Sequence, residues 1–559
     1  MLSLLIAHII ITVVCLWSGF LFYNLFRRND KEPKSVVFYA ISGLILLTVF
    51  AQIVALIFPI STYVQLVVAA ILLISLLLKW KSSKDLYQIV LSELSSWSLF
   101  SAVLFIIAWL VILLINAGPT MMDDTESYHI QSIKWIQEYG TVPGLVNLHE
   151  RFGFNSSWFS STALFSFSPK TSGGFTALNG VLSMWLCYWC ISKYNQFQKE
   201  NNSQAAVAIL MIFITTLVVW PLLRGNAATT NYDFITTCIV LILFTEIFLS
   251  KEDSPSIEWI IWPVYLCTVR VINFPLLLLS LFALFYFIKR KRIKFLFLPV
   301  AYCLLLIVPF LIRNIMIAGY PFYPATYFDL VTVDWKPDPQ ITERLLEYIK
   351  YYNRVSTTYM EIGQTKALGA NWMGTWFSHL FFFDKLLVVS GLAGILATIA
   401  KLFSGKHHRD NKSILLMAVI IVGLICWFFI SPDPRFVYGI LLFGIVLFAY
   451  HFLSIIKNTT LLKTASRVMI ILMIAGSVFY FISKSWKQKE YRNWIMPVQL
   501  PQPPVKEIAV DGIIFYMPEK INNNWNARCY STNLPCLYKI DPRLKTRGKN
   551  IRSGFRLEK

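Results

Sequence analysis

The chain has 559 residues, of which 56% are hydrophobic, and its mean hydropathy is +0.59. These values exclude an ordinary soluble protein and indicate a polytopic membrane protein. The formal net charge of +20 does not indicate nucleic-acid binding, because the Lys and Arg residues form short clusters between apolar segments instead of a basic groove with interleaved aromatic residues.

Apolar segments long enough to cross a bilayer recur along the whole chain, and their number predicts about 14 crossings, uncertain by about two. They lie at 2–26, 36–58, 62–79, 97–117, 172–193, 204–222, 232–250, 258–274, 275–288, 295–312, 380–403, 413–430, 436–456 and 464–483. We therefore expect an all-α polytopic membrane protein. The segments 258–274 and 275–288 are short, and we expect the chain to turn between them at Pro275.

The basic clusters indicate the orientation of these segments. Lys and Arg are enriched in cytoplasmic loops, and the clusters lie at 27–28, 79–84, 289–294 and 406–412. With these loops inside, the segments 118–171, 313–379 and 484–559 all lie outside. The basic stretch 484–492 is the one exception to this pattern. We expect a multi-pass protein of the plasma (inner) membrane with its active site on the extracytoplasmic side.

The three outer segments carry their own signals. Residues 341–349 have apolar positions three and four apart, which predicts an amphipathic helix. The tail 484–559 contains strand-like patches such as 508–516 among many Asn and Pro residues, typical of a small, loop-rich cap. Cys529 and Cys536 lie in this tail, and a disulfide between them is consistent with an oxidising compartment. The other seven cysteines lie in apolar segments, where Cys behaves as a small hydrophobic residue.

The most informative motif follows the fourth apolar segment and reads Met-Asp-Asp-Thr-Glu-Ser-Tyr-His over 122–129. Ionisable groups at a membrane boundary are costly to desolvate and often mark function. A solvated acidic loop is the alternative. Asp124 can act as a general base on an acceptor hydroxyl, or can hold a divalent metal (Mg or Mn) together with Asp123. His129 is a secondary candidate for acid–base chemistry.

Four arginines lie near the outer ends of apolar segments: Arg224, Arg270, Arg313 and Arg435. Each one alone reads as an ordinary helix-end residue whose charged head reaches water. Four of them facing an acidic loop suggest a site for an anionic phosphate, which Arg binds through two parallel hydrogen bonds, and we place Tyr128 in the same site. The sequence has no P-loop or dinucleotide-binding glycine motif. A phosphate-linked donor embedded in the membrane therefore fits better than a nucleotide.

At these residues the chain resembles the GT-C superfamily of membrane glycosyltransferases, which carry an Asp-Asp or Asp-Glu motif in the first outer loop of their core. Asp123-Asp124 matches that motif. The chain is more similar to a group of bacterial membrane proteins with the pattern Asp-Thr-x-x-Tyr-His, found here at 124–129. Further matching segments are 134–135, 142–149, 151–155, 313–314, 319–321, 433–436 and 529–536.

The resemblance implies a GT-C-like core at 97–483, preceded by three accessory helices in 1–96 and followed by the cap at 484–559. It implies transfer of a sugar from a polyprenyl-phosphate carrier to a glycan, lipid or protein acceptor of the cell envelope, with no role for nucleic acid. Two alternatives remain open. One is a polysaccharide polymerase or ligase that uses lipid-linked donors, and the other is a transporter of lipid-linked glycans or solutes, which would place ionisable groups near the bilayer midplane.

Overall fold

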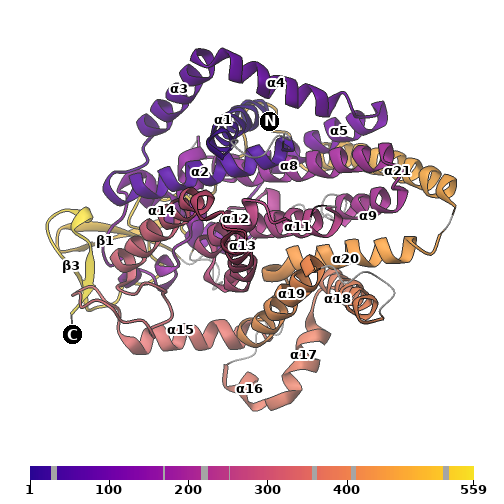
Figure 1. Ribbon diagram of the computed structural model, residues 1–559. Coiled ribbons are helices and arrows are strands. Elements are labelled where there is room, and N and C mark those ends of the chain that lie inside the picture. Colours follow the sequence, from indigo (N-terminus) through magenta and orange to yellow (C-terminus); the bar gives the residue numbers. More distant parts are fainter. Residues whose placement is uncertain are drawn as a thin grey trace.

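Ten helices in the described part of the chain are long and apolar enough to cross a membrane in the computed structural model (Figure 1). The structure describes residues 1–26, 34–167, 170–215, 225–250, 252, 254–355, 362–404, 411–456, 458–519 and 528–558. The ten are α1 (Leu2–Phe26), α2 (Val36–Ile57), α5 (Leu99–Ala117), α8 (Ser172–Lys199), α13 (Leu277–Lys289) with the 3₁₀ turn Val271–Leu276 before it, α14 (Ile293–Ala318), α18 (Phe382–Phe403), α19 (Asn411–Ile430), α20 (Tyr438–Leu453) with the 3₁₀ turn Pro434–Val437 before it, and α21 (Thr459–Lys487). The expectation of a mostly helical, multi-pass membrane protein is confirmed.

The other apolar helices differ from simple crossings. Helices α3 (Thr62–Leu78) and α4 (Trp80–Leu94) meet at a bend of 94°. Three more helices are shorter than the ten: α9 (Ser203–Phe213), α11 (Asp233–Leu249) and α12 (Glu258–Val269). The structure thus supports ten crossings, or eleven if the bent pair is one span, and the number of about 14 stays a prediction.

The expected turn at Pro275 is wrong. Helix α12 ends at Val269, Arg270 is extended with φ −155° and ψ 123°, and the chain re-enters helical structure at Val271. Pro275 lies inside the following 3₁₀ turn, Val271–Leu276, and does not mark the turn between the two helices. The extended backbone at Arg270 coincides with the pairing of its guanidinium with Asp233.

Close helix pairs hold the bundle together. Helices α1 and α2 approach at Gly19 and Gly43, where an added Cβ would lie 1.8 Å from a backbone carbonyl oxygen of the partner helix. Helices α18 and α20 approach in the same way at Gly394 and Gly444. Small residues permit this approach where lipid supplies no hydrophobic driving force between helices. Helix α8 lies at the centre, with 94% of its most apolar window buried.

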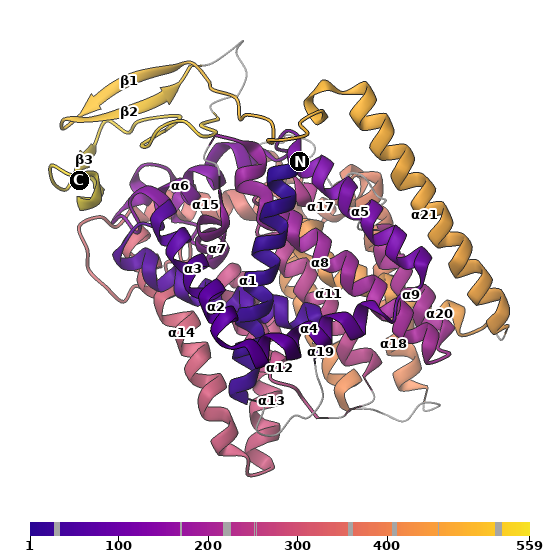
Figure 2. The same cartoon turned by 90° about the horizontal axis from the view of Figure 1, so that it is seen from above.

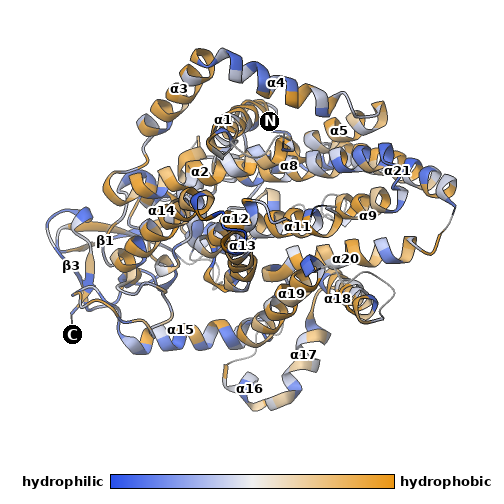
Figure 3. Ribbon diagram, in the orientation of Figure 1, coloured by the Kyte–Doolittle hydropathy of each residue, from blue (hydrophilic) through white to orange (hydrophobic). Residues whose placement is uncertain are grey.

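The outer surfaces of the bundle are apolar. Phe285 and Leu281 on α13 and Phe297 and Leu304 on α14 are exposed, as lipid-facing side chains are. Figure 3 shows apolar residues along most helices, whereas α4 and α15 (Pro339–Tyr352) carry polar stretches. Helix α15 confirms the amphipathic helix predicted for 341–349, with Leu345 buried.

The described parts of the segments 118–171, 313–379 and 484–559 gather at one end of the bundle. Figure 2 shows the C-terminal strands at the same end of the bundle as the N-terminus, and the turn between α13 and α14 at the opposite end. The amino group of Met1 donates to the carbonyl of Asn493 at 2.6 Å. Asn147 Nδ2 donates to the carbonyls of Trp335 and Phe555 at 2.9 and 3.1 Å, which joins all three outer segments. These elements include α6 (Ile130–Glu138), α7 (Ser157–Phe165), α16 (Ile362–Ala367) and α17 (Trp372–His379).

The C-terminal cap is formed by two antiparallel strand pairs. Strand β1 (Val505–Val510) pairs with β2 (Ile513–Pro518), and β3 (Leu544–Thr546) pairs with β4 (Phe555–Leu557). The strand-like patch 508–516 therefore contains a hairpin turn at Asp511-Gly512, both of which have positive φ. Phe515 and Phe555 pack with Trp135 and Val142 in a second hydrophobic core, so the cap is fixed on the first outer loop.

We expect thiol labelling in intact cells to separate the two ends. Cysteines introduced at Tyr327 and Lys549, both exposed, should react with a membrane-impermeant maleimide, whereas one at Arg290 in the α13–α14 turn should react only after lysis. Labelling of the parent chain, without an introduced cysteine, gives the background from the cysteines that it already has. Labelling of residue 290 with protection of 327 and 549 would reverse the orientation.

Candidate functional site

The acidic motif forms a single π-helical turn between α5 and α6. The turn spans Thr125–His129, and the N–H of Ile130 donates to the carbonyl of Thr125. Such one-turn π segments are rare and occur often at functional sites. Asp124 lies at its start, where the backbone N–H of Thr125 donates to the carbonyl of Met122 at 3.0 Å. The motif thus begins as the chain leaves α5 and turns back onto the bundle.

Asp124 is held by two arginines from distant parts of the chain. Its Oδ1 lies 2.8 Å from Nη1 of Arg151, and its Oδ2 lies 3.5 Å from Nη2 of Arg435. Burial raises the pKa of the Asp124 carboxyl, but the positive charges of Arg435 and Arg151 outweigh burial, so the pKa is lowered from its ordinary value. Asp124 is therefore an anion near neutral pH, with 22% of its side chain exposed.

Arg435 joins Asp124 to two further carboxylates. Its Nε lies 3.0 Å from Oδ2 of Asp433 and 3.7 Å from Oδ2 of Asp233. Arg270 in turn pairs with Asp233. We refer to Asp124, Arg151, Asp233, Arg270, Asp433 and Arg435 as the charge cluster. Each member lies at a helix end or in a loop, which is where a side chain can turn toward residues of other helices.

Aromatic rings enclose the charge cluster. The Arg270 guanidinium lies 3.4 Å from the ring centre of Phe436 and 5.6 Å from that of Tyr232. Arg151 lies 5.5 Å from the ring centre of Tyr128. Cation–π contacts of this kind are stronger in a desolvated site than at an exposed surface. The rings therefore help to keep the guanidinium groups in place.

His129 lies beside the charge cluster and is 2% exposed. Its ring is 4.4 Å from that of Tyr128, 5.1 Å from Phe159 and 5.4 Å from Tyr232. Neither ring nitrogen has a hydrogen-bond partner within the described structure. Burial, only partly offset by Asp124, lowers the pKa of His129 to about 3. The imidazole is therefore neutral at physiological pH.

An apolar hollow adjoins the charge cluster at Phe436. It is bounded by α11, the turn before α13, α19 and α20, and its lining includes Ile272, Leu276, Trp427, Phe436 and Ile440. Phe436 faces both this hollow and Arg270. A molecule with an anionic head and an apolar tail would find suitable surroundings for both parts here.

Asp123 and Glu126 face away from the charge cluster, toward the cap. Nε of Arg528 lies 2.8 Å from Oδ1 of Asp123, and its Nη1 pairs with Glu126. The Asp123 side chain is 67% exposed. The two adjacent aspartates therefore pair with different arginines. This arrangement does not support a metal site shared by Asp123 and Asp124. No group of three or more His, Cys, Asp or Glu residues is suitably placed for a metal within the described residues.

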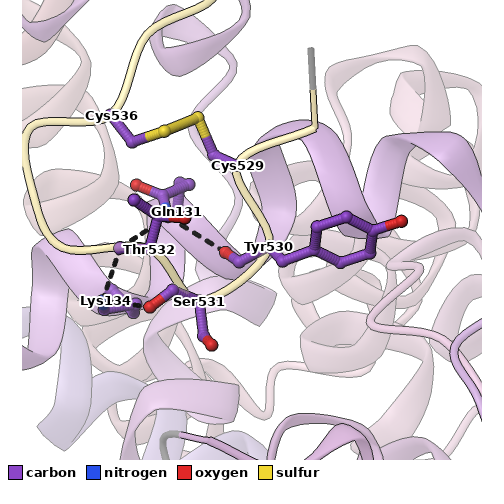
Figure 4. The surroundings of a disulfide bond; sticks show 7 residues. All are labelled: Gln131, Lys134, Cys529, Tyr530, Ser531, Thr532 and Cys536. Atoms are coloured by element: carbon purple, nitrogen blue, oxygen red, sulfur yellow. Dashed lines mark hydrogen bonds between the residues drawn. A yellow bond between two sulfur atoms is a disulfide. The ribbon is translucent and has the colours of Figure 1, made fainter. Parts of the chain in front are cut away.

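The loop closed by the Cys529–Cys536 disulfide docks on α6 (Figure 4). Lys134 Nζ donates to the carbonyls of Ser531 and Thr532 at 3.0 and 2.8 Å. Gln131 Nε2 donates to the carbonyls of Tyr530 and Thr532, and the N–H of Tyr530 donates to the carbonyl of Glu126 at 2.9 Å. The cap is thus hydrogen-bonded to α6, the helix that follows the acidic motif.

The structure brings only some of the predicted residues together. Arg270 and Arg435 join Asp124, and Tyr128 and His129 adjoin it. Arg313 does not take part in the charge cluster, because its Nη1 donates to Oδ1 of Asn155 at 2.8 Å in a separate cavity. Arg224 lies outside the described residues.

Four important residues were missed as site residues by sequence reasoning: Arg151, Asp233, Asp433 and Arg528. Asp433 is two positions from Arg435, and Asp233 starts an apolar helix. Ionisable residues in such positions often mark function, so both aspartates could have been found from the sequence. Arg151 lay in a recognised segment without an assigned role. Arg528 carried no signal, because its role depends on how the cap folds back.

We expect replacement of Lys134 by Met to loosen the cap. The change removes two charge-assisted hydrogen bonds and should weaken cap docking by about 1.5–3 kcal/mol. Hydrogen exchange at 528–537 should accelerate, while the unfolding temperature of the bundle changes little. Lys539→Met, an exposed lysine of the same cap, is the control. Unchanged exchange in Lys134→Met would contradict the docking role.

We expect His129 to make the fold sensitive to acid. Its pKa is about 3 in the folded protein and ordinarily 6.5. The unfolded chain therefore binds the proton first. The stabilisation is fully present above pH 6.5 and is lost as the pH falls toward 3, by at most about 2 kcal/mol between pH 6.5 and 5. Unfolding temperatures between pH 5 and 8 should show a shallower dependence in His129→Gln. The exposed His379→Gln should match the parent, and equal slopes in all three proteins would contradict this role.

No curated protein and no solved structure matches the chain. A family model described as Domain of unknown function (DUF8201) matches residues 1–442. The matched region contains the acidic motif and every member of the charge cluster, whereas the cap follows it. Because the match covers most of the chain, the protein belongs to the DUF8201 family.

Proposed function

We propose that the protein is an integral-membrane glycosyltransferase with a GT-C-like fold. It transfers a sugar from a polyprenyl-phosphate-linked donor to a glycan, lipid or protein acceptor at the extracytoplasmic face of the plasma membrane. The single observation that carries the proposal is the position of Asp124. Its carboxylate lies between Arg151 and Arg435, and Arg435 contacts Phe436, whose ring lines an apolar hollow.

The two halves of this site suit the two halves of a lipid-linked donor. Guanidinium groups bind phosphate oxygens through paired hydrogen bonds. The guanidinium groups of Arg270 and Arg435 lie 3.4 and 5.1 Å from the ring centre of Phe436, and this ring also lines the hollow. A phosphate at these arginines would therefore place a polyprenyl chain against apolar side chains. The members of the charge cluster lie at helix ends and in loops, which fits an enzyme better than a midplane transport path.

The formal charges of the charge cluster cancel, because it contains three aspartates and three arginines. A donor phosphate that binds Arg435 must compete with the carboxylates now paired to it. A carboxylate that loses its guanidinium partner becomes a stronger base, since the cation that lowered its pKa is gone. Donor binding would thus convert Asp124 from an ion-pair partner into a general base for the acceptor hydroxyl.

Arginine and histidine have complementary roles in this scheme. Arg151 keeps Asp124 oriented at 2.8 Å while Arg435 turns to the phosphate. Arg435 and Arg270 stabilise the negative charge that develops on the leaving phosphate. His129 is neutral and has free ring nitrogens in the described structure, so it can donate to or accept from a sugar hydroxyl.

We expect Asp124→Asn to lower product formation by about a hundredfold or more, because the amide cannot accept the proton. Asp123→Asn is the matched control, since it makes the same change one residue away at a carboxylate that faces Arg528. Membranes carrying each variant at equal expression are incubated with polyprenyl-phosphate-linked radiolabelled hexoses. Radiolabel is then counted in the glycan, lipid and protein fractions.

The outcomes separate the alternatives. Wild-type incorporation by Asp124→Asn would end the glycosyltransferase mechanism. If Arg435→Ala alone lost activity, a polymerase or ligase that relies on arginine would be favoured. Movement of an unchanged lipid-linked sugar between the leaflets of reconstituted vesicles would favour transport.

A further inference from the structure

A second cavity at the outer end of α14 contains a buried cation without a counter-charge. Arg313 is 5% exposed and lines this cavity with Ser132, Trp135, Asn155 and Phe159. Among the described residues it makes one hydrogen bond, from Nη1 to the neutral Oδ1 of Asn155 at 2.8 Å. No acidic residue lines the cavity, and no ion pair of the described residues includes Arg313. A buried charge without a partner is strongly destabilising.

Three polar atoms around this cavity are buried and lack a hydrogen-bond partner within the described structure. They are Nε of Arg313, Nε1 of Trp135 and Oγ of Ser132. The first two can only donate a hydrogen bond, and the hydroxyl of Ser132 can donate as well. The cavity therefore presents donors on several sides and one uncompensated positive charge. Its occupant must accept hydrogen bonds and carry negative charge.

Neighbouring groups do not supply that charge. The C-terminal carbonyls of α14 carry a partial negative charge, but they have donors of their own. Gly144 N donates to the carbonyl of Met316, and Trp335 Nε1 donates to that of Ile315. The amide of Asn155 is also occupied, because its Nδ2 donates to the carbonyl of Phe310 at 3.2 Å.

We propose that this cavity binds a small monatomic anion, chloride under ordinary conditions. The cavity has room for about one group the size of a water molecule, which suits a halide and is too small for a phosphate. The ion would accept from Arg313, Trp135 and Ser132, and would thereby connect α14 with α6. The site is separate from the charge cluster, and the proposal does not depend on the proposed function.

The test measures the unfolding temperature of the full chain in detergent as sodium chloride replaces sodium gluconate at constant ionic strength. A ligand that binds only the folded protein raises stability in a saturable way. We expect such saturation for the parent chain and its loss in Arg313→Met. Ser132→Ala keeps the charge but removes one donor, so the apparent Kd for chloride should rise about threefold to tenfold. Arg543→Met, an exposed arginine paired with Asp541, should respond like the parent.

Bromide locates the ion directly. Crystals of the full chain grown in sodium bromide should show an anomalous peak in the cavity next to Arg313, and this measurement remains decisive if Arg313→Met does not fold. Absence of both the peak and the chloride response would mean that the cavity holds only water, and would overturn the proposal. Protection by sulfate or phosphate but not by chloride would overturn the assigned ion class. An undiminished chloride response in Arg313→Met would place the ion elsewhere.

Discussion

The pairing of Arg435 with three aspartates is the interaction on which the candidate site depends. A guanidinium group that leaves water must gain partners of opposite charge or destabilise the fold. Arg435 finds these partners in the acidic motif, at the start of α11 and in its own turn. All three aspartates lie at the start of a helical segment, where a side chain can turn toward residues of other helices. The buried charge is thus satisfied where helices begin.

The break between α12 and α13 shows this most clearly. Apolar residues continue on both sides of Arg270, and nothing in the hydropathy demands an interruption. The extended backbone at Arg270 directs its side chain to Asp233 and Phe436. The electrostatic gain from that pairing, together with the cation–π contact, offsets the lost helical hydrogen bonding. Helix ends in this protein are placed by charge as much as by apolar length.

The architecture was predictable from the sequence to the extent that hydropathy determines it. Long apolar segments such as 36–58 and 97–117 correspond closely to α2 and α5, because a bilayer imposes their length. The course of the chain after the segment 62–79 was harder to predict, because apolar composition alone does not reveal that the chain bends there by 94°. The amphipathic pattern at 341–349 was sufficient for α15, because its period is that of a helix.

The candidate site was predictable only as a set of charged residues, without their pairing. Asp123 and Asp124 are indistinguishable by composition, yet one faces Arg528 and the other faces Arg151 and Arg435. Successive positions on a helical turn point in directions about 100° apart, so two adjacent carboxylates inevitably contact different neighbours. Which neighbour each meets depends on the cap and on loops that are hundreds of residues away.

The partners of the arginines were equally impossible to predict from the sequence. Arg270, Arg313 and Arg435 looked equivalent in the sequence. In the structure Arg270 follows the end of α12, Arg313 lies within the last two turns of α14, and Arg435 lies in the turn before α20. Two of them are neutralised by aspartates, so an anionic ligand must compete for them and can release a carboxylate as it binds. Among the described residues, Arg313 pairs only with the neutral Asn155, so the proposed anion would displace no carboxylate there. The first arrangement suits a ligand that comes and goes, and the second suits one that stays with the fold.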